Sequence, residues 1–277
     1  MATAISVHNL VRLFDRRGAP PVRAVDGISL EVGEGELYSL LGPNGAGKTT
    51  TISMLSGLLR PTSGDVRING VSLTENSIEA KRHIGIVPQE IALYPRLTAR
   101  QNLDYFGRIY GLSGTLLRKR TDELLEFVEL SERGSDRIET FSSGMRRRVN
   151  IAAGLLHRPP ILYMDEPTVG VDPQSRRRIL DLIKHLKDEQ GIAILYTTHL
   201  MEEAQELSDT VGIIDHGKLI ATGTQRELTA MVGEYDRIEL DLDAISAGPG
   251  FIEPIADLEG VAEVETEPAG DDGGPGV

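Results

Sequence analysis

The stretch Gly42-Pro43-Asn44-Gly45-Ala46-Gly47-Lys48-Thr49-Thr50 decides the fold of this chain. It fits the pattern G-x-x-x-x-G-K-[ST], in which backbone N–H groups curl around the phosphates of a nucleotide. The apolar run 37–41 predicts a buried strand before it, and residues 50–59 predict a helix after it. The N-terminus of that helix is expected to point at the same phosphates. We predict that all nine residues bind the nucleotide, with Lys48 on the β- and γ-phosphates and the Thr49 hydroxyl on Mg²⁺.

The composition of the 277 residues excludes several classes of protein. A hydrophobic content of 40% allows a sizeable core, and the absence of cysteine excludes disulfides, cysteine-ligated zinc and thiol catalysis. The formal net charge of −13 argues against nucleic acid as a partner. Residues 1–7 do not resemble a signal peptide, and no run approaches the ~18 apolar residues that cross a bilayer. We expect a cytoplasmic protein without direct membrane insertion, so that any membrane role comes through a partner.

Strand and helix patterns alternate along the chain. Strands are expected, besides 37–41, at 5–10, 25–32, 65–71, 84–89, 161–164 and 192–197, and in a hairpin of 211–214 with 219–222. Residues 15–21 are expected to form a loop, and Asp172-Pro173 to begin a helix that ends at Gln190. This alternation predicts an α/β fold: a phosphate-loop NTPase core with a mostly parallel sheet and an antiparallel β edge.

Residues from about 90 to 158 differ from the rest of the chain in that their apolar residues follow helical spacing. One predicted helix face carries Leu116, Leu117, Leu124, Leu125 and Val128. A second carries Val149, Ala152, Ala153 and Leu156, in a helix that Pro159-Pro160 is expected to stop. We predict an inserted helical subdomain at about 90–158.

The pattern weakens after about residue 225. Ile238, Leu240 and Leu242 alternate like a strand, and Val261 and Val264 suggest a second one. Residues 269–276 are mostly glycine and acid, a composition typical of a disordered tail. The expected domains are therefore 1–225, for nucleotide binding, and 226–277, a short C-terminal extension with a disordered tail.

A second set of polar residues completes the predicted site. Asp165 ends an apolar strand, which suits a Mg²⁺ ligand, and the adjacent Glu166 can deprotonate the attacking water. Four further features are compatible with roles at a phosphate: Gln89 after a strand, Ser142-Ser143-Gly144 before a helix, the helix cap Asp172, and His199 after a strand. Taken singly, each of these four also has an ordinary explanation as a surface amide, a helix cap or a strand end.

Together and in this order, these features resemble the ATP-binding cassette family, the nucleotide-binding subunits of ABC transporters. The resemblance covers about residues 4–225. It rests on the phosphate loop, Ile86-Val87-Pro88-Gln89, the signature Phe141-Ser142-Ser143-Gly144-Met145, Asp165-Glu166, Val171-Asp172 and Thr197-Thr198-His199. Arg146-Arg147-Arg148, with a one-domain chain and a short extension, resembles the drug- and antibiotic-exporter (ABC-2 type) branch.

The resemblance implies a role for each matched position. The implied catalytic residues are Glu166 as the base, His199 as a contact of the γ-phosphate, Lys48 and Gln89. The implied Mg²⁺ ligands are Thr49, Gln89 and Asp165. Ser142 and Gly144 bind the γ-phosphate of the opposite subunit in a homodimer that encloses two ATP molecules. Asp172 tunes that interface, and Phe14 stands where the family stacks an aromatic ring on adenine. The resemblance further implies a separate membrane permease, contacted by the helical subdomain and by Gln89, and a peripheral location on the inner face of the cell membrane.

Two departures from the family pattern matter. The family signature reads Leu-Ser-Gly-Gly-Gln, and Ser143 stands here in place of the first glycine. Its hydroxymethyl group is expected to lie close to a phosphate and to reduce the efficiency of hydrolysis. The second departure is the C-terminal extension. The segment after Met231 resembles the opening strands of the small α/β extension that exporter-branch relatives often carry, and then becomes rich in glycine and acid, so the extension looks truncated.

The sequence therefore predicts an ATPase subunit that powers export of a drug-like or lipid-like substrate. A soluble ABC-type ATPase of translation or DNA repair is the alternative, but the double cassette of the first and the long coiled coil of the second are missing. A GTPase switch is disfavoured because no lysine follows an asparagine, as the guanine motif Asn-Lys-x-Asp requires.

Overall fold

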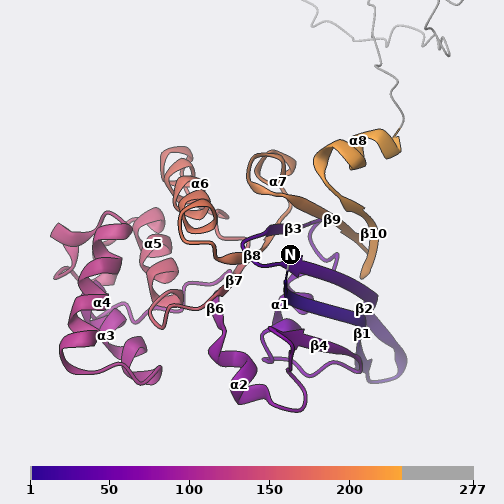
Figure 1. The fold of residues 1–277 in the computed structure, drawn as a ribbon, viewed down its shortest axis with the longest axis horizontal. Coiled ribbons are helices and arrows are strands. Elements are labelled where there is room, and N and C mark those ends of the chain that lie inside the picture. The colour runs from indigo at the N-terminus through magenta and orange to yellow at the C-terminus, as the bar shows by residue number, and fades with distance from the viewer. Residues whose placement is uncertain (1, 233–277) are drawn as a thin grey trace, which may run out of the picture. The chain divides into compact units, whose positions relative to one another are not determined.

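The computed structural model describes residues 2–232, which are drawn in colour in Figure 1. The chain divides into the compact unit Met1–Leu228 and a second unit, Thr229–Val277. The strands are β1 (Thr3–Arg16), β2 (Ala19–Gly33), β3 (Leu37–Leu41), β4 (Ser63–Ile68), β5 (Val71–Ser72), β6 (Ile84–Val87), β7 (Ile161–Asp165), β8 (Ala193–Thr198), β9 (Thr210–Asp215) and β10 (Lys218–Gly223). The helices are α1 (Lys48–Leu55), α2 (Ser77–Arg82), α3 (Ala99–Ile109), α4 (Gly114–Phe127), α5 (Ser143–Gly154), α6 (Pro173–Asp188), α7 (Met201–Leu207) and α8 (Gln225–Val232), with 3₁₀ turns at Ser131–Arg133 and Ile138–Thr140.

A six-stranded sheet lies at the centre of the first unit. Its order is β10-β9-β3-β8-β7-β6, and all its pairs are parallel except the edge pair β10-β9. Parallel strands place their carboxyl ends on one edge, so the residues after β3, β6, β7 and β8 come together there. The predicted α/β class, with a mostly parallel sheet and an antiparallel edge, is confirmed.

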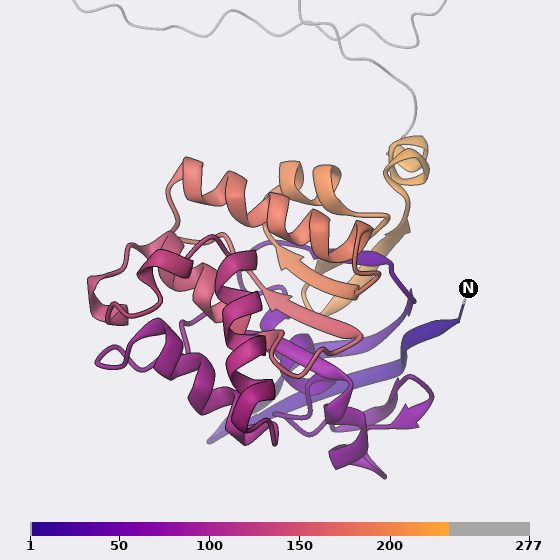
Figure 2. The ribbon, with the colours of Figure 1, turned by 60° about the vertical axis from the view of Figure 1, so that its left-hand side comes forward.

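The two faces of this sheet are buried in different hydrophobic clusters. Leu162 and Met164 of β7 belong to a cluster with the helical residues of α3–α6, whereas Ile161 and Tyr163 belong to one with α1, β1 and β2. Side chains that alternate along a strand point to opposite faces, so both faces of the sheet need a cover. Figure 2 shows α6 lying along one face of the strands. Burial of Tyr163 raises the pKa of its phenol.

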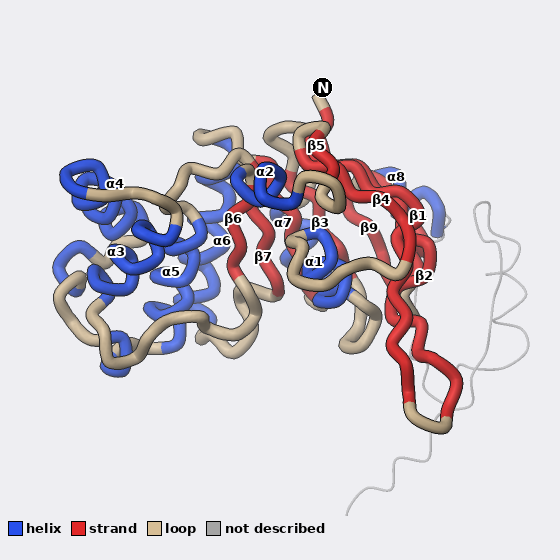
Figure 3. The backbone as a smooth tube through the Cα atoms, turned by 90° about the horizontal axis from the view of Figure 1, so that it is seen from below, coloured by secondary structure: helices blue, strands red, loops and turns tan. Residues whose placement is uncertain are grey.

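The antiparallel sheet is larger than the sequence indicates. A separate four-stranded sheet has the order β2-β1-β4-β5. The expectation of an edge strand at 5–10 and a loop at 15–21 is wrong, because β1 continues to Arg16 and β2 begins at Ala19 around the turn residue Gly18, whose φ is 73°. Figure 3 shows the β1–β2 hairpin projecting from the sheet. Pairing between strands can continue through polar residues, where no apolar alternation indicates a strand. The sequence pattern therefore underestimates the length of these two strands.

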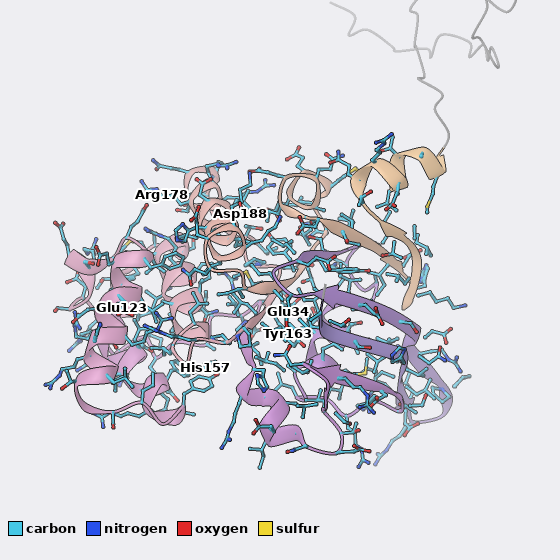
Figure 4. All side chains as sticks on the ribbon, in the orientation of Figure 1. Glu34, Glu123, His157, Tyr163, Arg178 and Asp188 are labelled. Carbon is cyan, nitrogen blue, oxygen red and sulfur yellow. The ribbon has the colours of Figure 1, made fainter. Side chains whose placement is uncertain are left out.

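Helices α3, α4 and α5 fall within the region at about 90–158 where helices were expected, and they lie together on one side of the sheet in Figure 1. Leu117, Leu124 and Leu125 are buried on one face of α4, but Leu116 is 61% exposed, so its assignment to the same face is wrong. It lies beside Leu117 on the helix, where a 100° step turns it out of the apolar stripe. Glu123 and His157, labelled in Figure 4, belong to this region.

Several predicted boundaries move by a few residues. The helix after the phosphate loop begins at Lys48 and ends at Leu55 rather than covering 50–59, because Gly57 turns the chain at φ 67°. Helix α5 ends at Gly154, before the Pro159-Pro160 pair that was expected to stop it. Strands β3, β7 and β8 and the β9–β10 hairpin agree with the prediction to within one residue. The predicted strands beyond residue 235 lie outside the described residues.

Among residues 2–232, no helix is long and apolar enough to span a membrane.

Candidate nucleotide-binding and catalytic site

The phosphate loop connects β3 to α1 and requires glycine at two points. A Cβ on Gly42 would lie 2.2 Å from the carbonyl oxygen of Ile214. Gly47 has a φ of 108°, and a Cβ there would lie 2.5 Å from the carbonyl oxygen of Ala24. A side chain at either position therefore meets backbone atoms that cannot move aside, and the loop keeps the tight path that a phosphate cradle needs.

Lys48 is the first residue of α1, and its side chain turns back over the loop. Its ammonium lies 2.8 Å from the carbonyl oxygen of Gly42 and 3.0 Å from that of Pro43, with the side chain only 4% exposed. It also lies 3.0 Å from Glu166 Oε1, in a buried ion pair. The first N–H groups of a helix have no partner inside it, so the start of α1 and the Lys48 ammonium together form a positive site suited to phosphate.

Glu166 is the centre of the buried polar cluster. Its Oε2 is 3.4 Å from Gln89 Nε2 and 3.4 Å from His199 Nδ1, and its Oε1 contacts Lys48. Its φ of 43° lies in the left-handed region, which a glutamate rarely adopts. Such strain persists where the surrounding structure enforces it, most often at functional sites. The tertiary structure thus brings three predicted catalytic residues, Lys48, Gln89 and His199, to the carboxylate of the fourth, Glu166.

Thr197, at the end of β8, holds the acidic pair in place. Its hydroxyl donates to Asp165 Oδ1 at 2.6 Å and accepts from the Glu166 N–H at 3.0 Å. Its carbonyl oxygen accepts from the same N–H at 3.2 Å. Sequence reasoning gave Thr197 no role of its own. Its position beside Asp165 in the β7–β8 register is the observation that identifies it.

The side-chain oxygens of Asp165, Thr49 and Gln89 are of the kind that Mg²⁺ prefers. Asp165 is buried, whereas Thr49 is exposed at the start of α1, and together with the Gln89 amide they supply only oxygen ligands. In the described part of the chain, no group of three or more His, Cys, Asp or Glu side chains is arranged to enclose a metal ion. Mg²⁺ is commonly bound through one or two carboxylates together with substrate phosphates and water. The residues present therefore suit a cation that enters with a nucleotide.

A second buried network fixes the loop that carries His199. Glu203 is fully buried and accepts hydrogen bonds from Tyr196, Thr198 and Arg176, each at 2.8 Å. Burial, followed by the charge of Glu203, raises the pKa of Tyr196, which keeps its hydroxyl as a donor. Sequence reasoning missed this network, because its members come from β8, α6 and α7.

The remaining predicted residues lie elsewhere in the chain. Ser142 is the N-cap of α5, and its hydroxyl accepts from the Met145 N–H at 3.2 Å. A Cβ on Gly144 would lie 2.2 Å from Ser175 Oγ, so packing of α5 against α6 also requires this glycine. Among residues 2–232, neither Ser142 nor Gly144 has a hydrogen bond or ion pair with the Lys48–Glu166 cluster.

Asp172 and Phe14 are likewise outside the cluster. Asp172 is the N-cap of α6, as predicted, and the hydrogen bond from the Ser175 N–H lowers the pKa of its carboxyl group. Phe14 lies within β1 rather than after a strand, and the Arg12 guanidinium sits 4.6 Å from its ring centre. The adenine contact of Phe14 stays a prediction.

The fold and this cluster define a phosphate-loop nucleoside triphosphatase. A glycine-built cradle, a buried lysine and two acidic residues at the carboxyl edge of a parallel sheet form its site. The ABC transporter family profile matches residues 25–169. The chain belongs to the ABC transporter family, and it is an ATP-binding, ATP-hydrolysing member.

Individual relatives agree with this assignment. The linearmycin resistance ATP-binding protein LnrL of Bacillus subtilis is 50% identical over 240 residues, which cover 87% of this chain and 76% of the relative. The doxorubicin resistance ATP-binding protein DrrA of Mycobacterium tuberculosis is 44% identical, with 86% and 73% covered. The ATP-binding cassette MJ0796, solved as a dimer in a post-hydrolysis state with ADP and Pi, matches with a TM-score of 0.73 and 28% identity. That match covers 79% of this chain and 98% of the cassette.

Proposed function

We propose that the chain is the ATPase subunit of an ABC exporter, and that the Glu166 cluster is its hydrolytic centre. The observation that carries the proposal is the meeting of Lys48, Gln89 and His199 on one strained, buried glutamate. In this role Lys48 binds the β- and γ-phosphates, and Glu166 accepts a proton from the attacking water. Residues 42–50 cradle the phosphates, and His199 holds the γ-phosphate.

The two acidic residues have different tasks: Asp165 binds the cation and Glu166 acts on the attacking water. We assign Asp165, Thr49 and Gln89 to Mg²⁺, which when bound neutralises charge on the β- and γ-phosphate oxygens. Thr197 keeps the Asp165 carboxylate and the Glu166 backbone in one arrangement through its 2.6 Å and 3.0 Å hydrogen bonds. Gln89 donates to Glu166 Oε2 and so orients the carboxylate toward the water. A preorganised site of this kind lowers the barrier without having to reorganise during the reaction.

The two halves of each ATP site are proposed to come from two chains. Ser142 and Gly144 have no bonds to the Lys48–Glu166 cluster in the described part of the chain, so a homodimer is the arrangement that lets them reach a phosphate. The dimeric MJ0796 cassette supports this arrangement. Asp172 is assigned to the dimer interface and Phe14 to adenine. The domains remain as proposed from the sequence: 1–225, with a helical subdomain at about 90–158, and the extension 226–277.

The transported substrate is proposed from the relatives. Their names refer to linearmycin resistance, doxorubicin resistance and Nod factor export, which supports export of a drug-like or lipid-like molecule. The membrane path belongs to a separate permease, which we place against the helical subdomain and the Gln89 loop. The chain then works at the inner face of the cell membrane.

A transport assay tests this function. Inverted membrane vesicles containing the chain together with its proposed permease should take up doxorubicin when ATP is added. Vesicles with Glu166→Gln should show no ATP-dependent uptake, because the proposed base is removed. The contrary result is that the vesicles hydrolyse ATP while ATP changes the uptake of no compound in a panel of drug-like and lipid-like molecules. That result would favour an ABC-type ATPase not tied to transport.

Replacing Ser143 by glycine should raise ATP turnover. Ser143 is the first residue of α5 and is partly exposed, and in the proposed dimer its hydroxymethyl group faces the partner's phosphate. Its removal relieves that crowding, so kcat should increase in a steady-state phosphate-release assay. The matched control is Ser77→Gly, because Ser77 is also the partly exposed first residue of a helix, α2, but lies outside the site. Equal or lower turnover for Ser143→Gly would show that the interface accommodates the serine.

A further inference from the structure

Three consecutive arginines of α5 have three different environments. Arg148 donates to the Val128 carbonyl oxygen at 2.5 Å and pairs with Glu129 at 3.3 Å, which ties α5 to the end of α4. Arg146 is partly exposed, and its side chain has no hydrogen bond or ion pair within the part of the chain that the structure describes. Arg147 is 3% exposed and extends toward the segment that follows β6. The three side chains therefore serve different purposes.

Arg147 holds two successive carbonyl groups of the Gln89 segment. Its Nη1 donates to the Pro88 oxygen at 2.8 Å, and its Nη2 donates to the Gln89 oxygen at 2.6 Å. The planar guanidinium presents its donors in a fixed fork, which lysine cannot reproduce. These bonds fix the backbone of Gln89, in a stretch that belongs to neither a helix nor a strand.

The same residue, Gln89, connects to the hydrolytic cluster through its side chain. Gln89 Nε2 donates to Glu166 Oε2 at 3.4 Å. A continuous path thus runs from α5 through Arg147 and the Gln89 backbone to the Gln89 amide and Glu166. The two hydrogen bonds from Arg147 are shorter than 3.0 Å, and the one from the Gln89 side chain to Glu166 is longer. The path therefore links α5 to the Gln89 amide through the Gln89 backbone.

The burial of Arg147 is costly for a residue that only fills space. Desolvation lowers the pKa of its guanidinium, and the charge of Asp165 acts in the opposite direction. Its Nε has no hydrogen-bond partner within the described residues. The two hydrogen bonds to the Pro88 and Gln89 carbonyl oxygens offset part of this desolvation cost.

We propose that Arg147 is a positioning residue that transmits the seating of helix α5 to Gln89 and Glu166. The inference rests on the proposed function, because the N-terminus of α5 carries Ser142, which is assigned to the partner's ATP. When that N-terminus docks on the partner's ATP, Arg147 positions the Gln89 amide at the chain's own ATP. Arg147 in this way couples the two ATP sites of the dimer.

A double-mutant cycle on the purified chain tests the inference. Arg147→Lys should lower kcat by about 10- to 100-fold, the effect of a small misplacement of a catalytic group, and leave KM for ATP unchanged. In the Gln89→Ala background the same substitution should have no further effect, because Arg147 acts through the Gln89 side chain. The Hill coefficient for ATP should fall from above 1 in the wild type to about 1 in Arg147→Lys.

Matched variants separate positioning from folding. Arg146→Lys should keep the wild-type kcat, since Arg146 makes no such bonds, and Arg148→Lys should lower the melting temperature without changing the Hill coefficient. If Arg147→Lys does not fold, Arg147→Gln, which can donate to one carbonyl, takes its place. Equal losses of kcat in both Gln89 backgrounds, or an unchanged Hill coefficient, would overturn the inference. A wild-type kcat in Gln89→Ala alone would overturn the proposed role of Gln89, and this inference with it.

Discussion

Glu166→Gln is expected to bind ATP normally and to lose roughly 10²–10⁴-fold in kcat, the usual contribution of a general base. The amide keeps the size of the side chain but cannot accept the proton of the attacking water. It also removes the charge that now pairs with Lys48 at 3.0 Å, so the ammonium is left free to bind the phosphates. ATP affinity is measured by equilibrium binding of a fluorescent ATP analogue, and turnover by phosphate release.

The control for this substitution is Glu132→Gln, which makes the same chemical change at an exposed glutamate that is not a member of the cluster. It should have wild-type turnover. Near wild-type turnover in Glu166→Gln would remove Glu166 from the role of base, and His199, 3.4 Å away, would then be the next residue to test.

Mixing two inactive variants should restore ATP hydrolysis. Lys48→Ala disables the phosphate loop of its own chain, and Ser142→Arg places bulk and charge where the partner's γ-phosphate docks. Each variant alone should be nearly inactive. A heterodimer of the two has one site built from two intact halves and one built from two defective halves. Activity should therefore return on mixing, measured as phosphate release against the ratio of the two variants.

Two controls accompany the mixing experiment. Ser142 caps α5, so Ser142→Arg also removes a helix cap, a change that costs about 0.5–2 kcal/mol. Thr98→Ala removes the equivalent cap of α3 and should leave turnover unchanged. ATP-dependent dimer formation in the Glu166→Gln background, seen by size exclusion, covers the case in which strict coupling between the two sites masks recovery. No recovery together with no ATP-dependent dimer would contradict the shared site.

The sequence alone determined the features that depend on neighbouring residues. Residues 42–50 specify a phosphate cradle because a glycine pattern, a lysine and a helix start are all local. The apolar run 37–41 is a strand, and Asp172-Pro173 begins a helix, because capping and strand burial act within a few residues. The order of the motifs along the chain was enough to indicate the family, and the profile match at 25–169 agrees with it.

Only the tertiary structure decided which of these residues meet. Gln89, Glu166 and His199 are separated by dozens of positions and converge because parallel strands β6, β7 and β8 end at one edge. The supporting residues Thr197 and Glu203 have no local pattern, since each is defined by partners on other elements. Leu116 faces solvent although it is as apolar as its buried neighbours, because the packing of α4 decides which face of the helix is covered. Arg147 is one of three adjacent arginines in the sequence, and its role follows from two backbone carbonyls that lie 58 and 59 positions away in the chain.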